Sequence, residues 1–173
     1  LAQTVRLLVW KAVKDGAVNK AKNRTWMGLG LILLLATVQF CCFFALKSIV
    51  MGSMLKDNNA KNHFNLYSEY YCPKIFLDGV HVLLIEVLKA LQNTRLAVNL
   101  QFVGFFLGGT MLMGYFGGVL NHENTIDGLW IGFILAEMAV VTVAAVVLGL
   151  VVDWKKEINK IGLNKLRKNL NKT

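Results

Sequence analysis

The sequence contains little proline, little cysteine and few acidic residues, and each shortage narrows what the chain can be. A single proline among 173 residues leaves long stretches in which nothing interrupts a helix. The three cysteines, Cys41, Cys42 and Cys72, form no C-x-x-C pair and no set with the spacing of zinc ligands. We therefore predict no disulfide framework, no metal site and no cofactor.

Motifs of catalysis are missing as well. The chain has no H-x-x-x-H pair, no serine nucleophile beside a base and no loop that would cradle a phosphate. Its apolar stretches hold too few polar residues to build an active site. The sequence therefore does not predict an enzyme.

Long apolar runs are abundant. Hydrophobic residues make up 55% of the chain and its mean hydropathy is +0.51. A helix needs ~20 mostly apolar residues to cross a bilayer. The fold class predicted is all-α, a polytopic membrane protein with four transmembrane helices, at about residues 26–46, 73–91, 96–119 and 128–152.

The second of these runs is expected to begin at Pro73, because the first turn of a helix does not use its N–H groups. The polar residues 56–71 before it are expected to form a solvated loop or a short surface helix. Residues 1–25 and 153–173 predict a basic amphipathic segment at the membrane surface and a basic interfacial tail. Their apolar stripes are Leu8, Val9, Ala12 and Val13 in the first, and Trp154, Ile158, Ile161, Leu166 and Leu170 in the second.

The net charge of +9 has a simple interpretation in a membrane protein. If both termini share one side of a four-span bundle, that side holds fifteen of the 19 lysines and arginines. Basic residues concentrate on the cytoplasmic side of membrane proteins, so we predict cytoplasmic termini, or matrix-facing ones in an organelle. Membrane lipids and further membrane helices are the expected partners. Nucleic acid is not, because aromatic residues suited to base stacking are not interleaved with the basic ones.

The second run differs from the others because it carries several ionisable residues. On a helix its ionisable residues fall within a sector of roughly 140°. A charge in hydrocarbon costs at least ~2.5 kcal/mol, so this sector is expected to face the bundle interior or a watery cavity. Its members are Lys74, Asp78, His81, Glu86 and Lys89.

Each member of the sector has two interpretations. Asp78 is a candidate acid for a coupling ion or proton, or it pairs with Lys74 four residues earlier. His81 is a candidate proton relay, since imidazole titrates near neutral pH, or it bonds a neighbouring helix. Glu86 is expected to pair with one of two cations near the end of the run, Lys89 or Arg95.

Glu137 lies near the middle of the fourth run, too far from either end to reach water by snorkelling. It must be protonated, be paired or face a cavity, so it is a candidate for coupling-ion or proton binding, or else a subunit contact. Small residues at spacing four allow helices to approach closely. The packing candidates are Gly104, Gly108, Gly114, Gly118, Gly128 and Gly132.

Several segments, in this order and spacing, resemble the C-terminal third of transporters of the multidrug and toxic compound extrusion (MATE) family. Residues 77–95 are similar to that family's tenth helix and the loop after it, and residues 96–109 to its eleventh helix. Residues 128–132 resemble the start of the twelfth helix and residues 153–157 its end. Val5, Arg6, Asp15 and Ala21 weakly echo the segment before the ninth helix.

The resemblance implies the C-terminal part of an exporter that exchanges organic cations or drugs for protons or sodium, with Asp78 matching the acid of the tenth helix. The sequence departs from the family at the loop glycines, replaced by Ala90, Leu91 and Thr94, and at residues 8–14. Because alternating access needs two bundles around a midplane site, four helices alone do not suffice. The chain begins at Leu1 without a signal-peptide pattern, so we expect a processed start or a longer protein. The alternative is a MATE-derived accessory subunit that does not transport.

Overall fold

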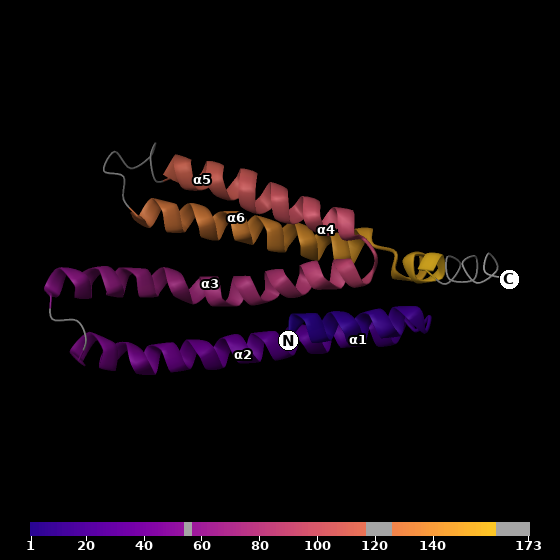
Figure 1. Ribbon diagram of the computed structural model, residues 1–173, viewed down its shortest axis with the longest axis horizontal. Helices are drawn as coiled ribbons and strands as arrows, with labels where there is room; N and C mark the ends of the chain where they lie inside the picture. The colour runs from indigo at the N-terminus through magenta and orange to yellow at the C-terminus, as the bar shows by residue number, and fades with distance from the viewer. Residues whose placement is uncertain (54–56, 117–125, 162–173) are drawn as a thin grey trace.

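The computed structural model describes residues 1–53, 57–116 and 126–161, and every regular element within these ranges is helical. The helical elements form an elongated bundle (Figure 1). In chain order they are α1 (Ala2–Lys14), α2 (Val18–Ser53), α3 (Asn58–Ala90), α4 (Thr94–Gln101), the π-helical η1 (Phe102–Gly109), α5 (Thr110–Gly114), α6 (Ile126–Val146), the π-helical η3 (Val147–Val151) and a helical segment over 154–161.

The helix α3 is the centre of the molecule. It packs against α2 on one side and α6 on the other, and the continuous path α4–η1–α5 packs on α6 (Figure 1). The short α1 contacts both α2 and α3. The core is therefore densest around the second half of α3, whose most buried apolar side chains are Leu83, Ile85, Val87, Leu88 and Leu91.

Three helical stretches are long and apolar enough to cross a membrane: Val18–Ser53, Thr94–Gly114 and Gly128–Val151. The first of them contains the first predicted span, and the other two overlap most of the third and fourth. Among the described residues, α3 is not one of them, since its apolar part is interrupted by charges and its first half is polar.

The prediction that a helix begins at Pro73 is wrong. Pro73 lies inside α3, which begins at Asn58 and is capped by the Asp57 side chain, whose Oδ1 accepts a hydrogen bond from the Asn59 N–H at 3.1 Å. The polar half of α3 is helical because it packs on the outer part of α2. There the Phe43 ring meets the rings of Tyr71 and Phe64 at 4.9 and 6.4 Å. Tertiary packing thus makes one continuous helix where the local sequence predicts a solvated loop or a short surface helix before the span.

The helix α1 packs into the bundle with most of the predicted apolar stripe. Val9, Ala12 and Val13 are buried as expected, and Val5 joins them, whereas Leu8 is 44% exposed. Gly16, at φ +72°, turns the chain back so that α2 runs alongside α1.

The tail prediction is tested only as far as residue 161. Trp154 and Ile158 are buried against the bundle, and the Trp154 Nε1 donates a hydrogen bond to the Leu148 carbonyl at 3.0 Å. Leu166 and Leu170 lie outside the described residues.

The predicted packing glycines have different surroundings. A Cβ on Gly132 would lie 2.6 Å from the backbone of α5 at Leu112 and Met113, and one on Gly104 would overlap the Val140 side chain. Gly114, in contrast, has no described atom within 4 Å of its Cβ direction, so no described residue packs closely there. Gly128 is buried, Gly118 is outside the described residues, and the surroundings of Gly108 are not described either.

Candidate functional site

Ionisable side chains from α3 and α6 meet in the interior of the bundle. Residues 74, 78 and 81 of α3 follow one another at helical spacing, so Lys74, Asp78 and His81 point to the same side. Glu137 of α6 lies opposite, with its carboxylate Oε1 3.5 Å from the His81 Nδ1. Glu137 is also close enough to Asp78 and Lys74 to interact with them electrostatically.

The His81–Glu137 pair is almost completely removed from solvent. The exposed fractions of the two side chains are 5% and 0%. The contact is within ion-pair distance but does not have the geometry of a hydrogen bond. Among the described residues, nothing else bonds the His81 Nε2 or either oxygen of Glu137. A buried polar group without a hydrogen bond costs about 1–3 kcal/mol. The pair therefore lowers the stability of the folded state.

Aromatic rings cover the pair. The Phe105 ring of η1 stacks on the His81 imidazole with centroids 5.1 Å apart, and Phe133 of α6 meets Phe105 edge-on at 5.5 Å. Phe105 is itself 36% exposed. The imidazole is therefore separated from the surroundings of η1 by a single ring. Sequence reasoning missed both phenylalanines, because aromatic residues in an apolar run carry no distinguishing signal.

Asp78 forms the ion pair with Lys74 that its spacing allows. The Lys74 Nζ lies 2.6 Å from the Asp78 Oδ2 and 4.5 Å from the centre of the Phe133 ring. The exposed fraction of the Asp78 side chain is 48%, against 19% for Lys74. Asp78 is thus the accessible carboxylate of the cluster, and Glu137 is the inaccessible one.

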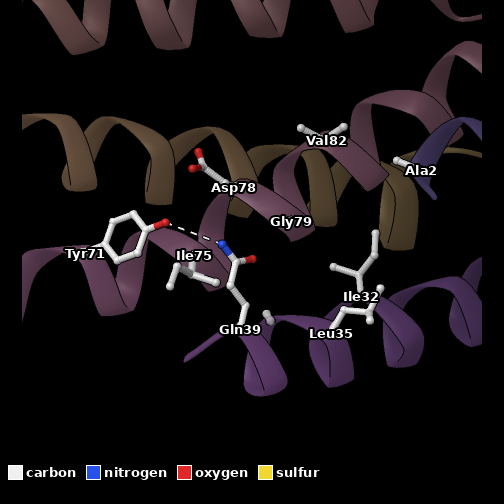
Figure 2. Close-up of a pocket in the computed structure, with 10 residues that line it drawn as sticks. Ala2, Ile32, Leu35, Gln39, Tyr71, Ile75, Asp78, Gly79 and Val82 are labelled. Carbon is white, nitrogen blue, oxygen red and sulfur yellow. Dashed lines mark hydrogen bonds between the residues drawn. The ribbon is translucent and has the colours of Figure 1, made fainter. Parts of the chain in front are cut away.

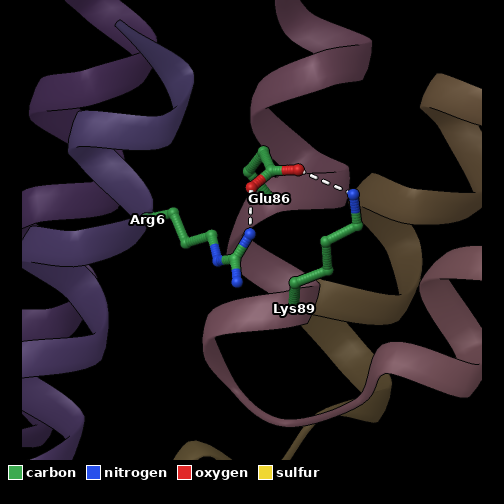
Figure 3. A network of polar contacts seen from close by, with 3 residues as sticks. All are labelled: Arg6, Glu86 and Lys89. Carbon is green, nitrogen blue, oxygen red and sulfur yellow. Dashed lines mark hydrogen bonds and ion pairs between the residues drawn. The ribbon is translucent and has the colours of Figure 1, made fainter.

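Glu86 belongs to a separate cluster. Its two oxygens accept hydrogen bonds from the Lys89 Nζ at 2.7 Å and from the Arg6 Nη1 at 3.1 Å (Figure 3). Lys89 is one of the two predicted partners. The other, Arg95, is exposed and forms no ion pair with any residue that the structure describes. Arg6 was not predicted, because it lies 80 residues away in the chain.

A pocket of about 340 Å³ lies between α2 and α3, beside the ionisable cluster (Figure 2). The Gln39 Nε2 of α2 donates a hydrogen bond to the Tyr71 Oη of α3 at 3.5 Å across it. The two helices approach closely where Gly79 faces Ile32, since a Cβ there would lie 2.8 Å from the isoleucine Cγ2. Sequence analysis did not single out Gly79 or Tyr71. Asp78 is the acidic residue of the lining, which otherwise includes Ala2, Leu35, Ala36, Ile75 and Val82.

No third ligand joins His81 and Glu137 to make a metal site. Within the described ranges, no three histidine, cysteine, aspartate or glutamate side chains converge to hold a metal ion. The chemistry that the pair supports is proton exchange. Imidazole and carboxylate together are neutral when they share one proton and carry a bare negative charge when they lose it.

Comparison of the chain with models of known protein families finds no match, and comparison with curated protein sequences finds none either. The resemblance to the MATE family therefore stays a hypothesis, and the functional argument depends on the residues themselves.

Proposed function

We propose that this chain is a helical lobe of a membrane transport protein, similar to the C-terminal part of a MATE exporter, in which a proton is exchanged for an organic cation. The observation that carries the proposal is the buried His81–Glu137 pair, in which the His81 Nε2 and both Glu137 oxygens lack a hydrogen bond from a described residue. A fold stabilised only by packing would gain by replacing such a pair with apolar side chains. The presence of such a pair is the reason that we propose a function requiring a titratable group inside the bundle.

In the proposed topology four helices cross the bilayer, with both termini on the cytoplasmic or matrix side. Three crossings use the apolar stretches of α2, α4–η1–α5 and α6–η3, and the second half of α3 supplies the fourth. The charges of α3 are tolerated there because α1, α2 and α6 surround it. His81 and Glu137 then both lie close to the middle of their spans, where transporters hold their coupling ions.

Charge balance gives the pair its role. With one shared proton the pair is neutral and suited to an apolar interior. Without it, a negative charge is left in a desolvated place, which is stable only when another cation enters. Asp78, half exposed and adjacent, is placed to pass the proton between the pair and the pocket beside α2. An incoming organic cation and the proton therefore compete for one negative charge.

The test is proton release on cation binding, because it does not need a complete transport cycle. The full chain is reconstituted in nanodiscs, tetraphenylphosphonium is added, and a pH-sensitive dye reports protons set free. We expect close to one proton per chain in the unaltered protein and none in Glu137→Gln or His81→Gln. The matched control is Glu69→Gln, which alters an exposed glutamate of the same bundle.

Three outcomes of this experiment would contradict or change the proposal. Release that persists in Glu137→Gln removes the pair from the mechanism. Release that follows added sodium in place of the organic cation would show that the pair binds sodium. An inserted, folded chain that releases no proton with either cation favours the alternative of a non-transporting accessory subunit.

A further inference from the structure

We infer that the end of the bundle carrying α1 and the 154–161 helix is a docking surface for anionic phospholipid headgroups. The surface, here named the basic collar, collects exposed lysines and one arginine from four separate parts of the chain. They are Lys11 and Lys14 of α1, Lys20 and Lys22 of α2, Arg95 of α4, and Lys155, Lys156 and Lys160 of the last helical segment.

The fold, and not the order of the chain, brings these residues together. The end of α1, the start of α2, the turn between α3 and α4 and the 154–161 helix all lie at one end of the molecule (Figure 1). A groove at this end is lined by Lys20 of α2 and Lys155 of the last helix, with Gly16 and Ala17 of the turn between them. Cations from distant segments thus share a single surface.

The collar is not neutralised by the protein. Its eight basic residues are accompanied by three acidic ones, Asp15, Asp153 and Glu157. None of the eight forms an ion pair with a described residue, since all four such pairs in the structure involve other cations. In addition, the Asp153 Oδ1 accepts hydrogen bonds from the backbone N–H groups of Lys155 and Lys156. A surplus of unpaired positive charge therefore faces outward.

The opposite end provides an internal comparison. The described basic residues there, Lys47 and Lys61, are matched by Asp57 and Glu69, and Lys47 donates to the Ser68 hydroxyl. Among the described residues, an excess of basic over acidic side chains is therefore found at the collar end and not at the opposite end, as expected for contact with a single leaflet.

Apolar side chains on α1 identify the partner as a membrane surface. Leu7 and Trp10 are 64% and 42% exposed, and the Lys14 Nζ lies 5.1 Å from the Trp10 ring centre. Exposed tryptophan and leucine beside lysine are typical of segments that lie at the level of lipid headgroups. Binding of a soluble anion or a nucleic acid would not bury the exposed Leu7 side chain. The inference depends on the membrane placement proposed above, but not on proton exchange.

The test measures lipid selectivity by electron spin resonance. The full chain is reconstituted in phosphatidylcholine with trace spin-labelled phosphatidylglycerol or phosphatidylcholine, and the motionally restricted fraction gives the relative association constant. Because one cation near an anionic surface changes partitioning about fivefold, we expect phosphatidylglycerol to be preferred at least about fivefold. The preference should fall below about twofold in the variant Lys11→Gln, Lys14→Gln, Lys20→Gln, Lys22→Gln. It should persist in the control Lys47→Gln, Lys61→Gln.

A salt titration of the unaltered chain gives the same answer without any variant, since ~1 M salt should remove the preference. Equal association of the two lipids, or equal loss in the control variant, would overturn the inference. Displacement of the labelled lipid by millimolar inorganic phosphate would show that the collar binds free anions and not a bilayer. Proton release measured on the same samples separates this result from the fate of the proposed function.

Discussion

Two glutamates of this bundle are buried to a similar extent but differ in their hydrogen-bond partners. The Glu86 carboxylate, 10% exposed, has a cation on each oxygen, one from α1 and one from its own helix. Glu137, fully buried, lies 3.5 Å from the His81 imidazole and has no hydrogen bond from a described residue. Glu86 therefore joins α1 to α3, whereas Glu137 is the acid that we propose exchanges a proton.

The largest expected effect comes from replacing the unsatisfied pair with apolar residues. The double variant His81→Leu, Glu137→Met removes two desolvated groups and keeps the volume similar. We predict that its free energy of unfolding rises by about 1–3 kcal/mol, while proton release disappears. Denaturation in mixed micelles measures the first quantity. A double variant less stable than the unaltered chain would mean that the pair is a structural contact, like that of Glu86.

The second prediction concerns the close contact between α5 and α6, the helix that carries Glu137. Gly132→Ala would put a methyl group 2.6 Å from the backbone of α5, which cannot move aside as a side chain can. We expect a loss of about 2 kcal/mol in the free energy of unfolding.

Gly114→Ala is its control. That position is open among the described residues, and alanine favours a helix over glycine by up to ~1 kcal/mol. The same micelle measurement should show no loss of stability. Equal destabilisation of both variants would exclude a specific contact at Gly132.

The third prediction concerns Glu86, whose two oxygens both accept hydrogen bonds from cations. Glu86→Gln weakens two charged hydrogen bonds, but Arg6 is 46% exposed and solvent already screens it. The expected loss is therefore only about 1 kcal/mol. Arg6→Gln combined with Glu86→Gln should cost less than the sum of the two single changes, as a double-mutant cycle would show. Proton release should be unaffected, and its loss in Glu86→Gln would join the two clusters functionally.

The smallest effect on stability is expected at Asp78. Its pair with Lys74 is half exposed, so Asp78→Asn should change the free energy of unfolding by less than about 0.5 kcal/mol. If Asp78 passes the proton to the pocket, the variant should slow proton release in a stopped-flow measurement without changing its amount. An unchanged rate would leave Asp78 as a surface ion pair only.

Much of the site could be predicted from composition and spacing. The Lys74–Asp78 pair follows from residues four apart on a helix, and the isolation of Glu137 follows from its distance to either end of an apolar run. The meeting of His81 with Glu137 could not be predicted, since the two residues lie in different helices. For the same reason, the stacking of Phe105 on His81 and the ion pair between Arg6 and Glu86 could not be predicted.

Periodicity and apolar length by themselves determined that the chain is helical and has stretches able to cross a bilayer, because these are properties of consecutive residues. The tertiary structure decided the rest. It extended α3 through Pro73 by packing aromatic rings against α2, and it buried Val5 of α1 in place of Leu8. It also gave one buried glutamate hydrogen bonds from two cations and left the other without a hydrogen bond from a described residue. Such choices depend on which helices become neighbours, and no local pattern of residues specifies that.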